Sequence, residues 1–379
     1  MPDPDGRTAP HGRAAPDRPA ALSGPQLRAT AGFIAAQQRP DGGIPSTADG
    51  PLDPWDHVES AMALSASGLR AEAERAYAYS ARTQRPDGSW PMLVRGDVVE
   101  DPAADTNQCA YLAVGVWHHY LVTRDRGFLD AMWPTVRRLT EFVLAAQRPT
   151  GELAWAVNRR GQTEDFALLT GSASAVQSVH SASLIAGTVG ADPRPWHAAA
   201  ARLAHAVRHH PGRFADRSRW SMDWYYPVLG GACRGGAARQ RLADGWDTFV
   251  WPAWGVRCVA DRPWVTVAET CELVLALDAV GDPRAHRLFR DVQRLRDPDG
   301  GYQMGYVVDD RVAWPDERPT WTAAAVLLAA DALSRTSPGA AVFADAGAMA
   351  RAARTPVAGC GCPPDAEPRY DLAGQGVAP

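Results

Sequence analysis

Apolar residues recur with helical spacing along most of the chain, whereas strand-like alternation is scarce. Two kinds of helical stretch follow one another. Charged amphipathic stretches such as RAEAERAYAYSARTQ alternate with more uniformly apolar ones such as TAAAVLLAADAL. A helix with one apolar stripe covers a core from outside, and a helix that is apolar on all sides is itself buried. The pattern therefore predicts an all-α fold with charged outer helices and apolar inner helices.

A short motif recurs at the ends of the charged stretches. Its frame is Gln or Arg, three residues, Gly, one residue and then an apolar or aromatic group. It occurs as QRPDGGI from Gln38, QRPDGSW from Gln84, QRPTGEL from Gln147 and RDPDGGY from Arg296, with two degenerate copies from Arg208 and Arg241. Proline does not continue a helix, and glycine accepts the left-handed conformation of a C-terminal cap. Six helix ends are therefore expected.

A second helical segment is expected after each copy, beyond a longer connection that is rich in Trp and Pro. These segments start near Asp53, Asp105, Gly171, Ser221, Pro263 and Asp316. Helical hairpins that cannot bury their apolar faces alone must stack on one another. Closing six of them gives an (α/α)6 toroid with the long connections on one face. That face is the predicted mouth of a central cavity.

Both ends of the chain lack the periodic apolar pattern. Residues 1–22 and 337–379 are rich in Pro, Gly, Ala and charge, which predicts two mobile tails around a toroid of residues 23–336. Cys360 and Cys362 form a close pair in the second tail, but the cysteines do not have the spacing of a zinc module. We expect no metal ion and no cofactor.

Composition narrows the class of partner. The 379 residues are 46% hydrophobic and carry a formal net charge of -4, without a basic stripe. No nucleic-acid partner is therefore expected. The longest apolar runs are too short to span a bilayer, and the N-terminus has no apolar signal core. We expect a soluble, cytoplasmic protein with a small-molecule substrate.

Acidic residues gather where the inner helices are expected to begin. Asp56 and Glu59 are three residues apart, as are Glu269 and Glu272, so each pair shares one helix face. A carboxylate within an apolar helix must face a cavity or a buried partner. We expect Glu269 in the cavity and Glu272 beside an arginine such as Arg257. The alternative for the acids at helix starts is structural, because acids also cap helices.

Aromatic residues accompany these acids, and the chain has 14 tryptophans. Asp223 lies within the run RWSMDWYYP, whose aromatic density favours a pocket wall. Asp105 and Gln108 instead fit a capping box, in which the two side chains satisfy the first backbone donors of a helix.

The repeat and two longer stretches resemble known toroidal families. The spacing of Gln84, Gly88 and Trp90 resembles the Q-W repeat of squalene–hopene cyclases and protein prenyltransferase β-subunits. Residues 115–155 resemble the third hairpin of glucoamylase-like glycosidases, and WPDERPTWTAAAVLLAADAL from Trp314 resembles a bacterial group described as prenyltransferase-like or cyclase-like. The Asp-rich motifs of class I and class II terpene cyclases are absent, and the zinc ligands of β-subunits have no match.

The glycosidase resemblance implies positions for two catalytic carboxylates. In glucoamylase-like toroids the acid lies between helices five and six, and the base between helices eleven and twelve. The corresponding connections carry Glu164 with Asp165, and Asp316 with Glu317. The resemblance thus implies Glu164 as general acid and Glu317 as general base, while nearby tryptophans stack on sugar rings.

Three functions stay open. The first is an inverting glycoside hydrolase that acts on a sugar or glycoconjugate with Glu164 and Glu317. The second is a terpenoid cyclase or prenyltransferase-like enzyme acting on an isoprenoid, with tryptophans stabilising carbocations and Asp223 starting or ending the reaction. The third is a toroid that binds a sugar or lipid without turnover. The expected substrate contacts are Trp55, Asp56, Glu59, Asp105, Trp155, Asp165, Trp224, Tyr225, Trp264, Glu269, Trp314, Asp316 and Trp321.

Overall fold

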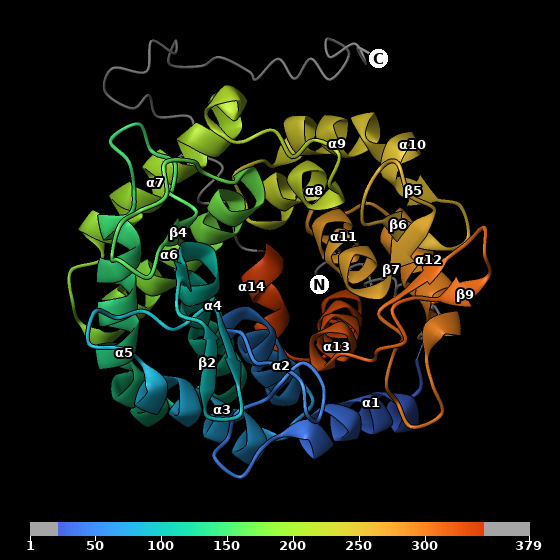
Figure 1. Cartoon of the computed structure of the whole chain (residues 1–379), viewed down its shortest axis with the longest axis horizontal. Helices are drawn as coiled ribbons and strands as arrows, with labels where there is room; N and C mark the ends of the chain where they lie inside the picture. The colour runs from blue at the N-terminus through green and yellow to red at the C-terminus, as the bar shows by residue number, and fades with distance from the viewer. Residues whose placement is uncertain (1–21, 345–379) are drawn as a thin grey trace, which may run out of the picture.

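The computed structural model describes residues 22–344 and confirms the all-α toroid, with two concentric rings of helices (Figure 1). The inner ring consists of α2 (Pro54–Ala66), α4 (Thr106–Thr123), α6 (Leu169–Val189), α8 (Ser221–Leu229), α11 (Val267–Ala279) and α13 (Thr320–Ser334). The outer ring consists of α1 (Gly24–Gln37), α3 (Arg70–Thr83), α5 (Arg126–Ala145), α7 (Arg194–His209), α9 (Gly235–Asp244) and α12 (Arg284–Asp291). Outer and inner helices alternate along the chain, so the chain makes six hairpins.

The inner ring closes on itself. Each inner helix packs against the next one in chain order, and α13 packs against both α11 and α2. Because an outer helix covers the back of each, the inner helices are buried on almost all sides; Leu64, Ala113 and Val274 are fully buried. This burial explains their uniformly apolar sequences. None of the helices between residues 22 and 344 combines the length and apolar character needed to cross a bilayer.

The repeated motif fastens each outer helix to the next. In the second copy, Gln84 Nε2 donates to the Gly88 carbonyl at 3.0 Å and to a carbonyl on α5, also at 3.0 Å. Gln84 Oε1 accepts from Arg138 of α5 at 2.6 Å. Gln38 and Gln147 make the same contacts to α3 and α7. The motif is therefore a joint between consecutive hairpins as well as a helix end.

The fourth copy completes the circle. Arg296 donates to a carbonyl of α1 at 3.3 Å, and Gly300 lies directly against the α1 backbone. The two degenerate copies do not make this joint. No atom lies within 4 Å of a Cβ built at Gly212, and a Cβ at Gly245 would meet the Trp224 ring. At these two copies, which the sequence already marked as degenerate, the glycine does not lie against the backbone of the next outer helix.

Replacing Gly88 by alanine tests the joint. Gly88 has φ +93°, and a Cβ there would lie 2.3 Å from the Arg138 carbonyl oxygen. Both strain and overlap oppose the alanine, so we expect Gly88→Ala to lower the free energy of unfolding by about 2–3 kcal/mol. Chemical denaturation measures the change. Gly212→Ala is the matched control, and an equal loss in the control would contradict the joint.

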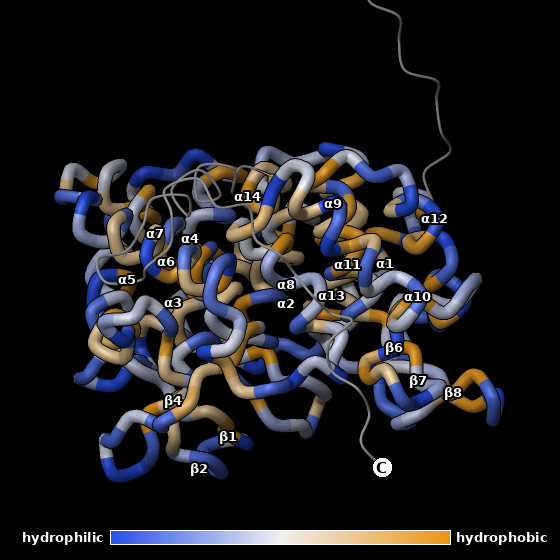
Figure 2. The backbone as a smooth tube through the Cα atoms, turned by 90° about the horizontal axis from the view of Figure 1, so that it is seen from above, coloured by the Kyte–Doolittle hydropathy of each residue, from blue (hydrophilic) through white to orange (hydrophobic). Residues whose placement is uncertain are grey.

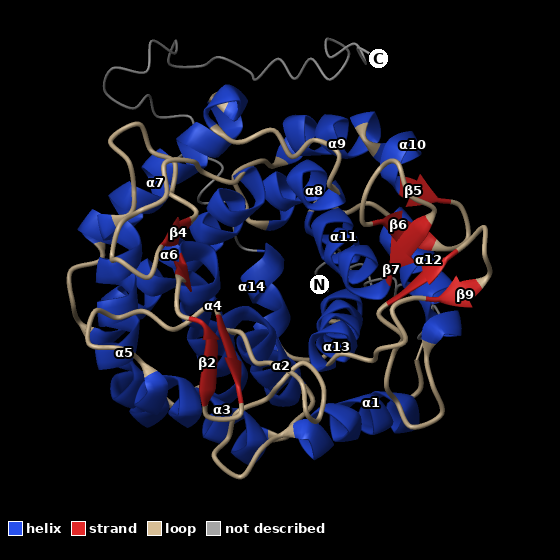
Figure 3. Ribbon diagram, viewed as in Figure 1, coloured by secondary structure: helices blue, strands red, loops and turns tan. Residues whose placement is uncertain are grey.

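The long connections all lie at one end of the barrel, which we call the mouth (Figure 2). They hold the short strands: β1 (Leu93–Arg95), β2 (Val98–Asp101), β3 (Ala104–Asp105), β4 (Ala156–Val157), β5 (Val250–Trp251), β6 (Gly255–Arg257), β7 (Trp264–Thr266), β8 (Gly305–Val307) and β9 (Val312–Ala313). β1 pairs with β2, β3 with β4, and β5 to β9 form a five-stranded antiparallel sheet (Figure 3). They also hold α10 (Trp246–Phe249), η1 (Pro211–Arg213) and η2 (Val292–Leu295).

A C-terminal segment closes the other end. η3 (Pro338–Ala340) and α14 (Ala341–Ala344) pack against inner helices inside the ring, opposite the mouth (Figure 2). Gln177 Nε2 of α6 donates to the Val342 carbonyl at 2.9 Å, and Arg234 donates to the Phe343 carbonyl at 3.2 Å. Val342 and Phe343 are buried.

The described residues include only the first part of the predicted C-terminal tail. Residues 337–344, which the sequence assigned to a tail, are folded into the barrel because their apolar side chains cover the ends of inner helices. Residues 1–21 and 345–379, including Cys360 and Cys362, lie outside the described residues.

Candidate active site

Five carboxyl groups from two inner helices meet at the mouth; we call them the carboxylate cluster. They are Asp53, Asp56, Glu59, Glu269 and Glu272. The three-residue spacing predicted that each pair would share a face, and α2 and α11 both turn that face to the ring interior. Asp53 and Asp56 are half-buried, whereas Glu59 and Glu272, one turn deeper, are only 2% and 4% exposed. The cluster therefore has an upper layer that a substrate can touch and a deeper layer.

The upper layer contains two neighbouring carboxyl groups at the start of α2. Asp53 caps the helix: its Oδ1 accepts from the backbone N–H of Trp55 at 2.8 Å and of Asp56 at 2.9 Å. The Asp56 carboxyl group lies close to the Asp53 carboxyl group. Burial, the Asp53 carboxylate and the charge of Glu59 hold the pKa of Asp56 well above its usual range. Asp56 therefore holds its proton to a higher pH than an ordinary aspartate does.

Glu269 lies in the first turn of α11, close enough to Glu59 and Glu272 to raise the pKa of both. Its side chain is 7% exposed, and its Oε2 has no hydrogen-bond partner among the described residues. The Cys258 thiol, in the turn between β6 and β7, is hydrogen-bonded to the same carboxyl group. A buried carboxylate oxygen with a free lone pair is placed to accept a proton from a water molecule.

Aromatic donors hold the deeper layer. Trp55 Nε1 donates to Glu59 Oε2 at 3.0 Å, and the phenols of Tyr225 and Tyr226 donate to the two oxygens of Glu272. Burial raises the pKa of Glu59 to about 8. Burial and the neighbouring carboxylates Glu59 and Glu269 raise the pKa of Glu272 well above its usual range, although the two phenols act in the opposite direction. The prediction that Glu272 pairs with an arginine is wrong, because its two oxygens accept from the two phenols.

An aromatic surface lies beside the carboxylates. Trp55 of α2 stacks on Tyr111 of α4 with ring centroids 3.6 Å apart, and Tyr226 of α8 lies 6.3 Å from Trp55. Asp105 caps α4 next to this stack, and burial raises its pKa to about 6. Stacked rings with adjacent carboxyl groups offer an apolar face and polar contacts together, which suits a sugar ring.

Glu164 and Glu317 lie in connections on different sides of the mouth. Glu164 is half-buried beside β4, whose Ala156 carbonyl accepts from its backbone N–H, and Asp165 is exposed. Glu317 is exposed and its carbonyl accepts from Met304, next to β8. β4 lies across the ring from β8 and β9 (Figures 1 and 2).

Asp316 and Glu317 also do not start a helix, as their sequence position suggested. Both are exposed, and α13 begins only at Thr320. Pro319 disfavours helical dihedrals in the residue before it, so the helix cannot start earlier. The Thr320 hydroxyl instead donates to the Pro45 carbonyl at 2.8 Å and ties the helix start to the first connection.

The other predicted contacts divide between the site and the scaffold. Asp223 is structural: its Oδ1 accepts from the backbone N–H of Thr170 at 3.1 Å and caps α6. Trp224 is buried and its Nε1 donates to the Arg241 carbonyl at 2.7 Å. Trp155 is hydrogen-bonded to Asp105 at the edge of the cluster. Trp321 is half-buried in the first turn of α13, and Trp264 and Trp314 lie on the five-stranded sheet.

Sequence reasoning missed three members of the site. Asp53 follows a helix-start pattern with Pro54, and that signal indicated only a cap. Tyr111 and Tyr226 carried no local signal, since their contacts to Trp55 and Glu272 depend on which inner helices face one another.

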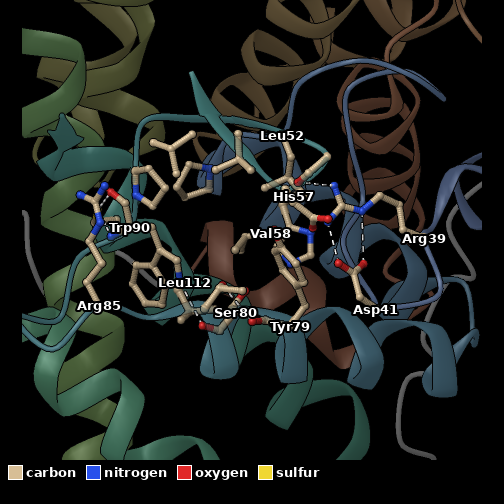
Figure 4. A pocket seen from close by; sticks show the side chains of 18 residues that line it. Arg39, Asp41, Leu52, His57, Val58, Tyr79, Ser80, Arg85, Trp90 and Leu112 are labelled. Atoms are coloured by element: carbon tan, nitrogen blue, oxygen red, sulfur yellow. Dashed lines mark hydrogen bonds and ion pairs between the residues drawn. The ribbon is translucent and has the colours of Figure 1, made fainter. Parts of the chain in front are cut away.

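A separate cavity of about 400 Å³ lies on the opposite face of α2 (Figure 4). It is bordered by Leu52, Trp90 and Val94, with the Arg39–Asp41 ion pair at one side. His57 lines it, but both ring nitrogens are used: Nδ1 accepts from Ile44 N–H at 3.1 Å and Nε2 bonds to a carbonyl at 3.0 Å. No group of three or more His, Cys, Asp or Glu side chains in residues 22–344 is arranged to hold a metal ion.

The raised pKa of Glu59 implies that the stability of the protein depends on pH. In the unfolded chain Glu59 ionises near its ordinary pKa of 4.5, whereas the folded protein keeps the proton up to about pH 8. Between pH 4.5 and about pH 8 the folded state therefore binds more protons than the unfolded state. The contribution of Glu59 to stability is lost as the pH rises through this range. We expect Glu59→Gln to raise the melting temperature at pH 8 relative to wild type, with less or no gain at pH 4.5.

Thermal melts at both pH values measure this difference. Glu141→Gln, on the exposed face of α5, is the control and is expected to behave alike at both. A Glu59→Gln variant with the same offset from wild type at both pH values would show that Glu59 ionises normally in the folded protein.

Comparison with known proteins identifies a relative that is a glycoside hydrolase. A protein from Mycolicibacterium hassiacum described as MMP endo-(1,4)-3-O-methyl-alpha-D-mannosidase is 54% identical over 332 residues, which cover 87% of this chain and 92% of that protein. No protein-family model matches the chain.

Three solved structures share the fold at low sequence identity. A glycosidase in complex with glucose is 15% identical, covering 86% of this chain and 96% of its own, with a TM-score of 0.65. A bacterial glucoamylase complexed with acarbose is 12% identical over 84% of this chain and 57% of its own, with a TM-score of 0.65. A GH63 mannosylglycerate hydrolase from Thermus thermophilus is 14% identical, covering 79% of this chain and 99% of its own, with a TM-score of 0.58. These three structures show the fold, and among the three functions left open the 54% identical mannosidase supports the glycoside hydrolase.

Proposed function

Because the chain belongs to the family of the M. hassiacum MMP endo-(1,4)-3-O-methyl-alpha-D-mannosidase, we propose that it hydrolyses internal α-(1,4) bonds between 3-O-methyl-D-mannose units. The observation that carries the proposal is the carboxylate cluster at the mouth. Glycoside hydrolysis needs one protonated and one ionised carboxyl group on either side of the bond. The cluster offers an acid with a raised pKa, Asp56, beside Asp53 at the start of α2, and a carboxyl group on α11 with one oxygen unpartnered among the described residues.

The roles follow from protonation and access. Asp56 donates its proton to the glycosidic oxygen as the bond from that oxygen to the anomeric carbon breaks. Glu269 removes a proton from the water molecule whose oxygen attacks the anomeric carbon. Asp53 keeps the Asp56 carboxyl oriented and takes part in its reprotonation. Burial is the largest cause of the raised pKa of Asp56, followed by the neighbouring Asp53 carboxyl group.

The arrangement favours inversion at the anomeric carbon. α2 and α11 are separated in the inner ring by α13, which packs against both. Carboxyl groups on helices two positions apart leave more room than groups on adjacent helices, and inverting enzymes need that room for the attacking water. Glu164 and Glu317 are not the catalytic pair in this proposal.

The substrate class agrees with the aromatic surface. Methylation replaces a sugar hydroxyl by an apolar ether, so a 3-O-methylmannose unit presents more apolar surface than mannose. The stack of Trp55 on Tyr111 can cover such a surface without leaving a polar group unpaired.

Incubation with an α-(1,4)-linked 3-O-methyl-D-mannose polysaccharide tests the proposal. We expect shorter chains from internal cleavage, and proton NMR of the first product should show the β-anomer of the new reducing end. Unmethylated α-(1,4)-mannan is expected to react more slowly. Absence of cleavage would overturn the substrate, and an initial α-anomer would overturn inversion.

A further inference from the structure

Exposed large apolar side chains are concentrated on two hairpins at the mouth. Among the described residues, five such side chains are exposed, and four of them are Val98 (66%), Val99 (47%), Val312 (49%) and Trp314 (56%). The first two lie on the β1–β2 hairpin and the other two on or next to β9. The fifth is Leu184 (36%), far from the mouth strands on α6. Chance exposure would scatter these residues over the surface, so the clustering points to an interaction at the mouth.

The two hairpins stand on either side of the helix that carries Asp56. The β1–β2 hairpin belongs to the connection that enters α4, and the β8–β9 hairpin to the connection that enters α13. Both α4 and α13 pack against α2. Figures 1 and 3 show the hairpins at separate positions around the mouth, with α2 between them.

Strand pairing connects the first hairpin to the acid pair. Val99 pairs with Val94, and Val94 bridges to Leu52, the residue before Asp53. Directly opposed residues share a face. The row from Val99 to Leu52 therefore leads from the tip of the hairpin to the start of α2, along the edge of the cavity drawn in Figure 4.

Strand pairing connects the second hairpin to Glu269 in the same way. Val312 pairs with Val307, and Val307 with Trp264 of β7. The Trp264 ring lies edge-on to Trp314 at 5.2 Å and its Nε1 donates to the Trp314 carbonyl at 2.7 Å. β7 runs directly into α11, so this apolar row leads into the helix of Glu269.

We propose that the two hairpins are outer subsites that hold the substrate chain on both sides of the bond to be cleaved. The inference rests on the proposed function and adds the path of the chain, which runs across the mouth from β1–β2 to β8–β9. An enzyme that cuts inside a chain must bind sugar units on both sides of the cut. Rows of valine and tryptophan suit a chain whose methyl ethers give it apolar edges.

The test compares a long and a short substrate. The variants are Val98→Ser combined with Val99→Ser on one hairpin and Trp314→Ala on the other, and Leu184→Ser is the matched control. The measured quantity is the ratio of kcat/KM for the α-(1,4)-linked 3-O-methylmannose polysaccharide to kcat/KM for its tetrasaccharide. We expect each hairpin variant to lower this ratio roughly fivefold or more, through KM for the long chain, and Leu184→Ser to leave it unchanged.

The alternatives give different results. An unchanged ratio in both hairpin variants overturns the subsites, and so does an equal loss with Leu184→Ser. A change in molar mass by light scattering, with the ratio unchanged, would identify the hairpins as a protein–protein contact and also overturn the proposal. Failure of wild type to cleave either substrate is distinct from these, because it rejects the proposed function itself. Because all substituted side chains are exposed, melting temperatures within about 2 °C of wild type are expected.

Discussion

Glutamine in place of Glu269 is expected to lower kcat on the methylmannose polysaccharide by about 10³-fold or more, the usual range for loss of a general base. Glutamine has nearly the same shape, so the first turn of α11 and its contact with Cys258 are expected to stay in place. What it lacks is an oxygen that can take a proton from the attacking water. Initial rates from reducing-end assays, with KM determined separately, measure the loss.

Glu152→Gln is the control for this experiment. Glu152 is also a buried carboxylate (4% exposed) with one unpartnered oxygen, but it lies in the connection before α6 and outside the carboxylate cluster. Its substitution is expected to leave kcat within about twofold of wild type, as for a group without a part in proton transfer. A Glu269→Gln variant that keeps a tenth of wild-type kcat would assign the base to another residue.

Asparagine in place of Asp56 is expected to have an effect that depends on the leaving group. With the polysaccharide, whose leaving oxygen must be protonated, kcat should fall by about 10²–10⁴-fold. With an aryl glycoside of 3-O-methylmannose, whose phenolate leaves without a proton, the loss should be far smaller. Glu269→Gln should instead lose activity on both substrates, because both reactions need the activated water.

The pH profile gives a second distinction between the two residues. The raised pKa of Asp56 implies that the acid keeps its proton to a higher pH than an ordinary aspartate, so the fall of kcat/KM at high pH reports its ionisation. Asp56→Asn should remove this limb of the profile with the aryl glycoside. Equal losses on both substrates, with the high-pH limb still present, would make Asp56 a binding group and move the acid to Asp53.

The repeat could be predicted from the sequence because its chemistry is local. A Gln, a Pro and a Gly at fixed spacing mark a helix end, and the structure adds that Gln84 and Gly88 join that end to the next outer helix. The alternation of charged and apolar helices then determines which ring each helix occupies. These signals repeat along the chain, so the fold can be predicted even though the copies with Gly212 and Gly245 do not make the joint.

The site was harder to predict because its contacts cross between helices. The spacing of Asp56 and Glu59 correctly indicated a shared face, but no local feature shows that Tyr225 and Tyr226 meet Glu272 from α8. The expected positions of the acid and base came from resemblance to other toroids, and they lie in connections. In this protein the carboxylate cluster stands on the first two turns of α2 and α11.

The C-terminal segment at the far end of the barrel affects how a polymer can be degraded. α14 packs against α4 and α11 inside the ring opposite the mouth, so it stands in the way of a chain that would pass from the mouth to the other end of the barrel. A chain end cannot be threaded through it, and both products of a cut must depart by the opening through which the substrate arrived. Repeated cutting while sliding along one chain is therefore disfavoured, and each encounter with a polysaccharide is expected to end in a single cut followed by release.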